Sequence, residues 1–187
     1  MSAADETDEA RPDGTGTTRH EPLGAGSLAA NVVAQAAMLL AALAHEEGDG
    51  GTAAQAQRIG TRAGVLSVSN DAAFARATQQ LLAAATGEGD GFWLEVTLGE
   101  AAATPRVICE TACDLALLAA YLAERCNGVR RADYVGIAHL SAAAASASAV
   151  LVRTNLVIAD DDWRLMAASG AAAEAAHAAL RAGGTGP

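Results

Sequence analysis

The 187-residue sequence contains no lysine, only four prolines and few aromatic residues. All 12 of its basic residues are arginine, six residues are aromatic, and 50 are alanine. Alanine is the best helix former, whereas aromatic residues favour strands, so this composition predicts an all-α fold. The formal net charge of −10 leaves no basic stripe for a nucleic-acid backbone or an anionic membrane surface. We therefore expect neither nucleic acid nor a membrane as a partner.

Cysteine is also scarce, and Cys109, Cys113 and Cys126 match no disulfide framework and no zinc site of known spacing. Cys109 and Cys113 share a helical face, which leaves metal binding as an alternative, but we favour buried small residues and predict no metal site. The N-terminus is acidic where a secretory signal would be basic. The apolar segment 27–44 is shorter than the roughly 20 residues of a bilayer span. We therefore predict a cytoplasmic protein.

The chain has the length of one domain. Residues 1–21 contain six acids and two arginines with little apolar surface, which predicts a disordered acidic tail whose deletion leaves the fold intact. We predict a helical domain over 22–182 and a flexible end over 183–187. The pattern within the domain predicts a compact bundle of about five helices. The first follows the turn at 22–27 and ends within 45–48, and the others lie over 52–85, 92–126, 129–155 and 161–181. Further expectations are an N-cap at Thr52, a kink at Pro105, and core contacts from Trp163, Leu165, Met166 and Leu180.

The fourth predicted helix has the most specific pattern. Its run AAAASASA, residues 142–149, has almost no side-chain bulk, so another helix can approach it closely. We predict that it forms the bundle centre or the interface of a homodimer, which Ala145→Leu should weaken. Asp133 and Asn155 share one face of this helix about 33 Å apart, so only an antiparallel partner helix brings both to one ligand. The alternative is that Asp133 pairs with Arg130 and Asn155 caps the helix end.

Two other segments carry polar groups at positions suited to a ligand. The stretch Gly24-Ala25-Gly26-Ser27 reads as a turn before the first helix, where backbone N–H groups can hold an anion or a carbonyl; close helix packing explains its glycines equally well. The second helix carries side chains at helical spacing that suit either a pocket wall or a solvated face with the aromatic ring in the core: Ser67, Asn70, Asp71 and Phe74.

The order of these features resembles the cyclodeaminase/cyclohydrolase family, which includes the C-terminal domain of formiminotransferase-cyclodeaminase. The resemblance covers about residues 22–181. It is carried by short motifs, namely Gly24, Gly26 and Ser27, Phe74 with its preceding polar pair, Ala103-Thr104-Pro105, Asn127, Asp133, Ala138, and Asn155-Leu156. It implies an all-α homodimer without a covalently bound cofactor. The implied small-molecule substrate is a tetrahydrofolate derivative, either methenyltetrahydrofolate, which is hydrolysed, or formiminotetrahydrofolate, which loses ammonia.

The resemblance also implies roles for individual residues. Asp133 becomes the acid–base or electrostatic group, with Asn70 and Asp71 as the other catalytic candidates. The ligand-binding candidates are Gly24, Gly26, Ser27, Asn127, Arg131, Arg153 and Asn155. The two arginines suit a substrate carboxylate because a guanidinium is a fixed fork of donors, and surface ion pairs are their alternative use.

The sequence departs from the family at the second helix. The family has an acid four residues before the phenylalanine, where this chain has Asn70. One residue turns a helix by 100°, so we expect Asp71 to point in a different direction. A neutral amide takes no proton at pH 7, so we expect hydrolysis of methenyltetrahydrofolate to be weak or absent. Asn70→Asp should raise this activity, and Asp133→Asn should abolish whatever native activity exists. The basic segment that follows the first helix in many members is replaced here by the acidic HEEGDGG of residues 45–51.

Three functions remain open. We favour an enzyme with the family's folate C–N chemistry. The second is a diverged enzyme that cyclises or hydrolyses a different iminium or amide-like substrate. The third is a non-catalytic ligand-binding or scaffolding dimer, which the small-residue helices alone would explain.

Overall fold

The computed structural model describes residues 24–87, 89–156 and 162–184, which form five α-helices. These are α1 (Ala25–Glu46), α2 (Gly50–Ala85), α3 (Gly91–Arg125), α4 (Arg130–Asn155) and α5 (Trp163–Gly183). These ranges contain no strand, so the predicted all-α bundle is confirmed. The predicted tail over 1–21, and residues 185–187 of the predicted flexible end, lie outside the described residues.

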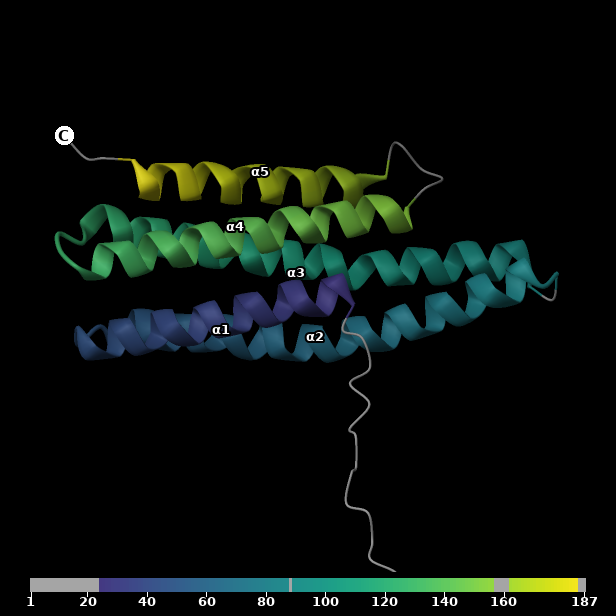
Figure 1. Cartoon of the computed structure of the whole chain (residues 1–187), viewed down its shortest axis with the longest axis horizontal. Coiled ribbons are helices and arrows are strands. Elements are labelled where there is room, and N and C mark those ends of the chain that lie inside the picture. The colour runs from purple at the N-terminus through teal and green to yellow at the C-terminus, as the bar shows by residue number, and fades with distance from the viewer. Residues whose placement is uncertain (1–23, 88, 157–161, 185–187) are drawn as a thin grey trace, which may run out of the picture.

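The five helices lie side by side along one long axis (Figure 1). α3 contacts all four other helices, α5 packs on α3 and α4, and α1 packs on α2, α3 and α4. α2 and α3 continue past the ends of the other helices and form a two-helix arm that ends at the connection between them (Figure 1). The start of α1 and the end of α4 meet these two helices at the base of the arm.

Alanine dominates the core. Most buried apolar residues are alanines, and only a few large side chains, such as Leu40, Leu115 and Ile137, lie fully buried among them. A methyl side chain lets two helix axes approach closely, so the core is thin and dense. Alanine also has the highest helix propensity, so the same residue that forms these helices sets their spacing.

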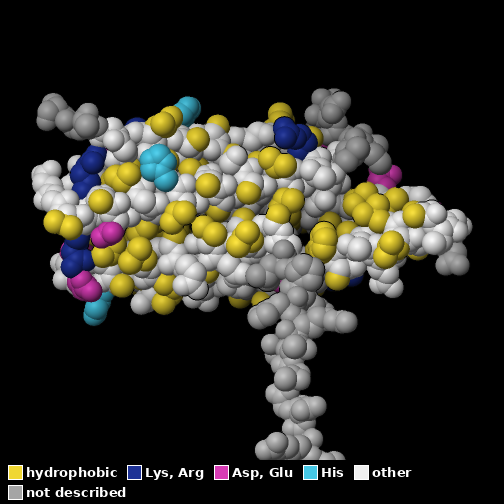
Figure 2. Space-filling model, viewed as in Figure 1, with side chains coloured by type: hydrophobic (Ala, Val, Ile, Leu, Met, Phe, Trp, Pro, Cys, Tyr) yellow, Lys and Arg dark blue, Asp and Glu magenta, His cyan; other side chains and the backbone are white. Residues whose placement is uncertain are grey.

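The last helix was predicted with the wrong packing face. The buried residues of α5 are all alanines, namely Ala168, Ala175, Ala178, Ala179 and Ala182. Trp163, Met166 and Leu180 are 60%, 69% and 68% exposed, and only Leu165 of the predicted core residues is partly buried. Close packing selects the small side of this helix and leaves its large side chains outside. Figure 2 shows hydrophobic side chains spread over the visible face of the molecule.

The helix ends are close to their predicted positions, with one cap reassigned. Asp49, not Thr52, is the N-cap of α2, since its carboxylate accepts a hydrogen bond from the Thr52 backbone N–H at 3.0 Å. Asp162 caps α5 in the same way, accepting from the Arg164 N–H at 2.8 Å. Pro105 lies fully buried within α3, and the helix continues on both sides of it.

The run of small residues in α4 has two sides. Its buried members are Ala144, Ala145 and Ser148, and its exposed members are Ala143, Ser146 and Ala147. The carbonyl oxygen of Ala145 lies 3.3 Å from Cys109 Sγ of α3, in the interior of the bundle. Ala145→Leu would therefore overpack the protein's own core, so the expectation that it tests a subunit contact is wrong. A test of a subunit contact needs a substitution on the exposed side of α4.

By length and composition alone, α1 and α4 are both able to cross a membrane. α1 has 22 residues and is longer than the apolar segment 27–44, so its length does not exclude a membrane span. Within the most apolar window of each helix, 56% of α1 and 39% of α4 is buried inside the fold. Core helices of a bundle pass the same test, and α1 and α4 are such helices here.

Candidate functional site

A cavity of about 230 Å³ lies at the base of the arm, where four helices meet. It is lined by the first residues of α1 (Gly24, Ala25, Gly26), by Asn70, Phe74 and Ala77 of α2, by Ala101 and Pro105 of α3, and by Leu151, Thr154 and Asn155 of α4. None of these side chains is ionisable. The cavity wall is therefore apolar with a few amide, hydroxyl and backbone polar groups.

The N-terminus of α1 faces this cavity. Gly24 is the N-cap, with an extended backbone and no side-chain cap, and the first hydrogen bond of the helix runs from Leu28 N to Gly24 O at 3.0 Å. The N–H groups of residues 25–27 consequently have no partner within the helix, and the positive end of the helix dipole lies at the cavity. The predicted turn is thus the first turn of α1 itself.

Gly26 is glycine because the Asn70 side chain lies against it. A Cβ on Gly26 would lie 2.4 Å from Asn70 Oδ1 and 2.7 Å from both Cγ and Nδ2. At Gly24 the nearest atom, Asn70 Nδ2, would be 3.7 Å away, which is an ordinary contact. The interpretation of the glycines as close packing is therefore confirmed for Gly26, and the packing brings an amide into the cavity wall.

Ser27 connects α1 to α2 and is fully buried. Its hydroxyl accepts a hydrogen bond from Asn70 Nδ2 at 3.1 Å and lies within hydrogen-bond distance of the Asp71 carboxylate and of the Ser67 carbonyl oxygen. Asn70 and Asp71 thus reach the same hydroxyl group, although only Asn70 lines the cavity and Asp71 is exposed, as expected for side chains that leave α2 in different directions. Ser27 of α1 is the residue that both side chains contact.

These contacts decide between the two interpretations of the second helix. Asn70 is only 6% exposed and Ser67 is buried, so this face of α2 is not a solvated one. Phe74 is 58% exposed and lines the cavity instead of entering the core. Asp71 is exposed and is not among the cavity-lining residues. The pocket-wall interpretation therefore holds for Asn70 and Phe74.

Asn155 closes the opposite side of the cavity. Its Nδ2 donates a hydrogen bond to the Ala101 carbonyl oxygen at 3.0 Å, so the side chain links α4 to α3 and does not cap its own helix. Leu151 and Thr154, which also line the cavity, were not predicted. They lie on the last turns of α4 beside Asn155, so extending that face by one turn would have found Leu151.

The remaining predicted residues lie elsewhere in the chain. Asp133 is exposed in the first turn of α4, 22 residues before Asn155 and thus roughly 33 Å away. Arg130 pairs with Glu46, so its predicted pairing with Asp133 is wrong. Asn127 is exposed in the α3–α4 connection at the same end. Within one chain, these residues therefore lie far from the cavity.

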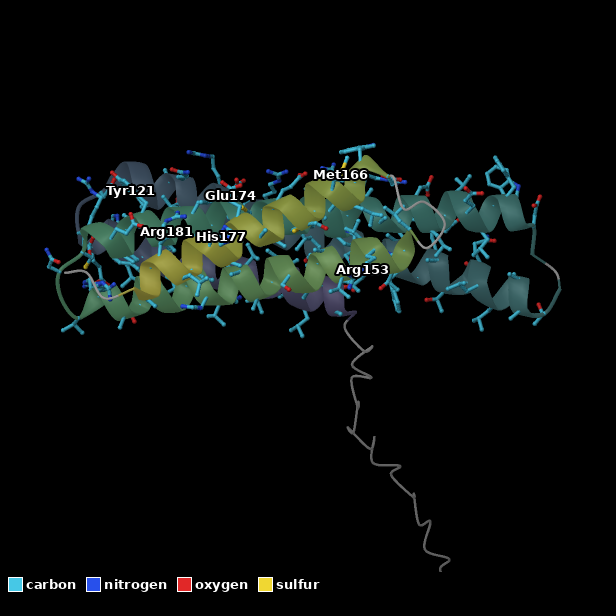
Figure 3. All side chains as sticks on the ribbon, turned by 90° about the horizontal axis from the view of Figure 1, so that it is seen from above. Tyr121, Arg153, Met166, Glu174, His177 and Arg181 are labelled. Atoms are coloured by element: carbon cyan, nitrogen blue, oxygen red, sulfur yellow. The ribbon has the colours of Figure 1, made fainter. Side chains whose placement is uncertain are left out.

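The two arginines proposed for a substrate carboxylate differ in their surroundings. Arg131 donates to the carbonyl oxygens of Ala182 and Gly184, at 2.8 and 2.6 Å, and so satisfies the end of α5. Its guanidinium has a structural partner, which argues against a ligand role. Arg153 is exposed on the part of α4 that adjoins the start of α1 (Figure 3). Its ligand role stays a prediction.

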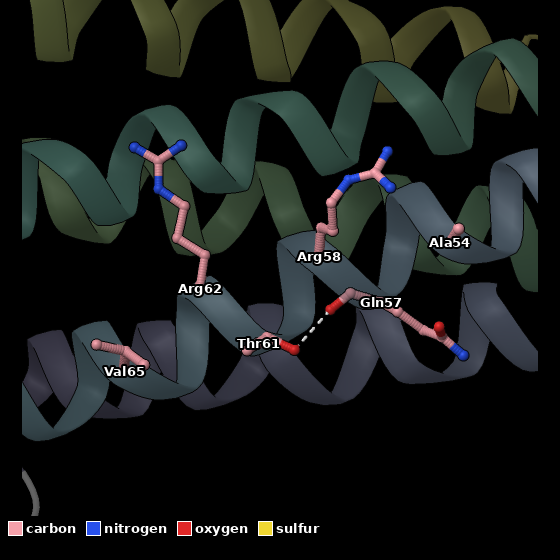
Figure 4. Close-up of a pocket in the computed structure, with 6 residues that line it drawn as sticks. All are labelled: Ala54, Gln57, Arg58, Thr61, Arg62 and Val65. Carbon is pink, nitrogen blue, oxygen red and sulfur yellow. Dashed lines mark hydrogen bonds between the residues drawn. The ribbon is translucent and has the colours of Figure 1, made fainter.

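A second depression, of about 560 Å³, runs along α2 and contains Arg58 and Arg62 (Figure 4). All of its lining residues come from this one helix, so it is a surface strip without converging groups. Arg62 also lies close enough to Asp114 of α3 to lower the pKa of that carboxyl, although burial raises it by more. The cavity at the base of the arm is the better candidate site.

Cys109 and Cys113 are buried, as predicted for small core residues. Burial raises the pKa of Cys109 to about 11 and, together with the neighbouring Glu174, raises that of Cys113 to about 12. Thiols with such pKa values are poor nucleophiles at neutral pH. Among the described residues there is no group of three or more His, Cys, Asp or Glu side chains that could hold a metal ion.

Comparison with known proteins gives one similar structure. No protein-family model matches the chain, and no curated protein matches its sequence. The fold is similar to the crystal structure of formiminotetrahydrofolate cyclodeaminase from Thermotoga maritima, with a TM-score of 0.73 and 21% sequence identity. The similarity covers 87% of this chain and 87% of that one. At this identity the comparison establishes the shared fold.

Proposed function

We propose that the protein is an enzyme of the cyclodeaminase/cyclohydrolase family that acts on a C–N bond of a folate one-carbon unit. The proposal is carried by one observation, namely that residues of the family resemblance from all four cavity-forming helices line the same cavity: Gly24, Gly26, Phe74, Pro105 and Asn155. The similar fold of a formiminotetrahydrofolate cyclodeaminase supports it.

The two candidate reactions share one centre, a carbon bonded to two nitrogens. In methenyl hydrolysis, a water oxygen bonds to this cationic carbon, one C–N bond breaks and a proton is released. In formimino deamination, a second nitrogen of the folate attacks the carbon and ammonia leaves. Both need the carbon held in place and a group that moves a proton. The cavity provides apolar walls and amide dipoles, but no ionisable side chain lines it.

We therefore include a second copy of the chain in the proposal, which supplies the partner subunit's Asp133. The outward face of α4 carries an uncharged stripe of exposed residues, namely Gly136, Leu140, Ala143, Ala147, Val150 and Thr154. Antiparallel pairing of two such stripes sets Ala143 opposite Ala147 and Leu140 opposite Val150, so small residues meet at the centre. The same pairing carries Asp133 of each chain to the end of the other chain's α4, beside Asn155. An isologous interface of this kind completes two equivalent sites.

The test combines activity with subunit mixing. We expect purified protein to be a dimer by light scattering and to consume methenyltetrahydrofolate, followed by loss of its near-ultraviolet absorbance, or to release ammonia from formiminotetrahydrofolate. Asp133→Asn should reduce turnover by about 10²-fold or more with an unchanged circular dichroism spectrum. Glu124→Gln, which removes an acid at the same end of the molecule, is the matched control and should keep activity.

Mixing then tests the shared site. Asp133→Asn and Asn155→Leu should each be inactive, whereas their mixture should regain part of the activity because a mixed dimer has one intact site. A monomer, or full activity of Asp133→Asn, would refute the shared site. Absence of turnover with both folates would refute the folate chemistry.

One observation favours a second candidate. Position 70 of the cavity wall holds a neutral amide where the family has a carboxylate, so the same fold could process a different iminium or amide-like substrate. This alternative also predicts a dimer, but with no turnover of either folate. Asp133→Asn should then reduce turnover of the different substrate.

A further inference from the structure

Both asparagines of the cavity have their NH₂ groups engaged by the protein. Asn155 Nδ2 donates to the Ala101 carbonyl oxygen, and Asn70 Nδ2 donates to Ser27 Oγ. The first assignment is forced by chemistry, because a carbonyl oxygen only accepts. In the described part of the chain, neither side-chain oxygen accepts a hydrogen bond.

The orientation of Asn70 is fixed by the same reasoning. The Ser27 hydroxyl has one proton, and two of its neighbours, the Asp71 carboxylate and the Ser67 carbonyl oxygen, can only accept it. The hydroxyl must therefore receive a hydrogen bond from its third neighbour, which is Asn70 Nδ2. Asp71 thus acts through Ser27 to direct the amide, and the carbonyl oxygen of Asn70 is the end left for a ligand.

We infer that the cavity binds the N–H donor edge of a planar, neutral or cationic group, such as an amide, an amidine or an aminopyrimidine, through Asn70 Oδ1 and Asn155 Oδ1. The inference rests on the proposed function in taking this cavity as the substrate site, and it names the part of the substrate that the cavity holds. Asn70 is 6% exposed, and in the described residues its side-chain oxygen has no donor, so a ligand N–H that reaches this oxygen adds a hydrogen bond. A carboxylate ligand would meet two oxygens of partial negative charge.

The N-terminus of α1 gives the opposite preference, since its free N–H groups attract an anion. The two features therefore predict different ligands. Benzamide, benzamidinium and benzoate share one ring and differ only in the group that would face the asparagines. If the amide oxygens decide, benzamide and benzamidinium bind and benzoate does not. If the helix terminus decides, benzoate binds most tightly.

The experiment is an amide-proton NMR titration of the full-length protein with each of the three compounds. We expect shifts at residues 25–27 with benzamide and benzamidinium, and none with benzoate. Asn155→Leu should weaken benzamide binding several-fold, up to about tenfold, because one hydrogen bond is lost. The matched control is Asn31→Leu, which makes the same substitution at a residue of α1 that does not line the cavity, and it should bind benzamide as the wild type does.

The inference is overturned if benzoate binds more tightly than benzamide, if none of the three binds, or if Asn155→Leu and Asn31→Leu weaken benzamide binding equally. The ranking of the three compounds uses only wild-type protein, so it holds as a test even if Asn155→Leu fails to fold. Selective benzamide binding without turnover of either folate supports the inference and refutes the proposed reaction. Turnover of either folate, together with tighter binding of benzoate than of benzamide, would support the proposed reaction and overturn the inference.

Discussion

Replacing Gly26 by alanine tests whether the close contact between α1 and Asn70 holds the cavity together. The new methyl group would lie 2.4 Å from Asn70 Oδ1 and 2.7 Å from its Cγ, so the buried amide has to move. Overpacking of this kind costs about 1–3 kcal/mol, and loss of the Asn70–Ser27 hydrogen bond adds about 1 kcal/mol. Against these stands a helix-propensity gain of at most about 1 kcal/mol. We expect a net destabilisation of about 1–3 kcal/mol.

The measurement is urea unfolding followed by circular dichroism, with two further variants. Gly64→Ala is the matched control, since a Cβ there meets nothing within 4 Å, and it should stabilise the protein by up to about 1 kcal/mol. The double variant Gly26→Ala with Asn70→Ala removes the obstructing amide, so its loss should be smaller than the sum of the two single losses. If Gly26→Ala is as stable as Gly64→Ala, the contact does not constrain α1 and the reasoning fails.

Three other predictions concern the interface, pH and the thiols. Ala147→Leu should shift the proposed dimer towards monomer in light scattering without loss of fold stability, whereas Ala145→Leu should lower the free energy of unfolding; equal effects of both variants would contradict the assignment of a buried and an exposed side to α4. The pKa of Asp162 is lowered to about 2 by Arg164, so the stability it contributes is full above its unfolded pKa of about 3.9 and is lost as pH falls towards 2; Asp162→Asn should remove this part of the acid transition. A thiol reagent at pH 8 should modify the partly exposed Cys126 first and the two buried cysteines only slowly, and three equal rates would refute this.

The helices could be predicted from the sequence because local signals determine them. Alanine-rich segments separated by glycine and asparagine breaks gave five helices in the observed order. The packing face of α5 could not be predicted in this way, because burial was assigned to the largest apolar residues. In this bundle alanine fills the interface between α5 and its neighbours, and Trp163 and Met166 lie on the exposed side.

The site could be predicted only in part, for a related reason. Helical spacing tells which residues share one face, and it correctly grouped Asn70 with Phe74. It does not tell which helix crosses that face or at what height. The crossing of α1 at Ser27 lets Asn70 and Asp71 contact one hydroxyl, although they point in directions 100° apart. The separation of Asp133 from Asn155, in contrast, follows from helix rise alone and was predicted from the sequence.

The Ser27 contacts also change what Asn70→Asp should do. The sequence alone suggests that this variant restores a family acid, but the structure places a second carboxylate, Asp71, on the same hydroxyl. One hydroxyl proton cannot serve two carboxylates, and the buried carboxylate introduced at position 70 would replace a donor by an acceptor, at a cost of about 1–3 kcal/mol. The folded-state pKa of this new carboxyl should therefore be raised, so the destabilisation grows as pH rises from about 4 through that pKa and shrinks as pH falls.

The double exchange of Asn70→Asp with Asp71→Asn separates this reasoning from a simple loss of packing. The exchange again provides one carboxylate to accept from Ser27 and one amide to donate to it, so it should recover most of the stability lost by Asn70→Asp at pH 7. Urea unfolding between pH 4 and pH 8 measures both variants. A stable Asn70→Asp that also hydrolyses methenyltetrahydrofolate faster than wild type would show that position 70 needs a carboxylate for catalysis, and that the hydroxyl of Ser27 does not dictate an amide there.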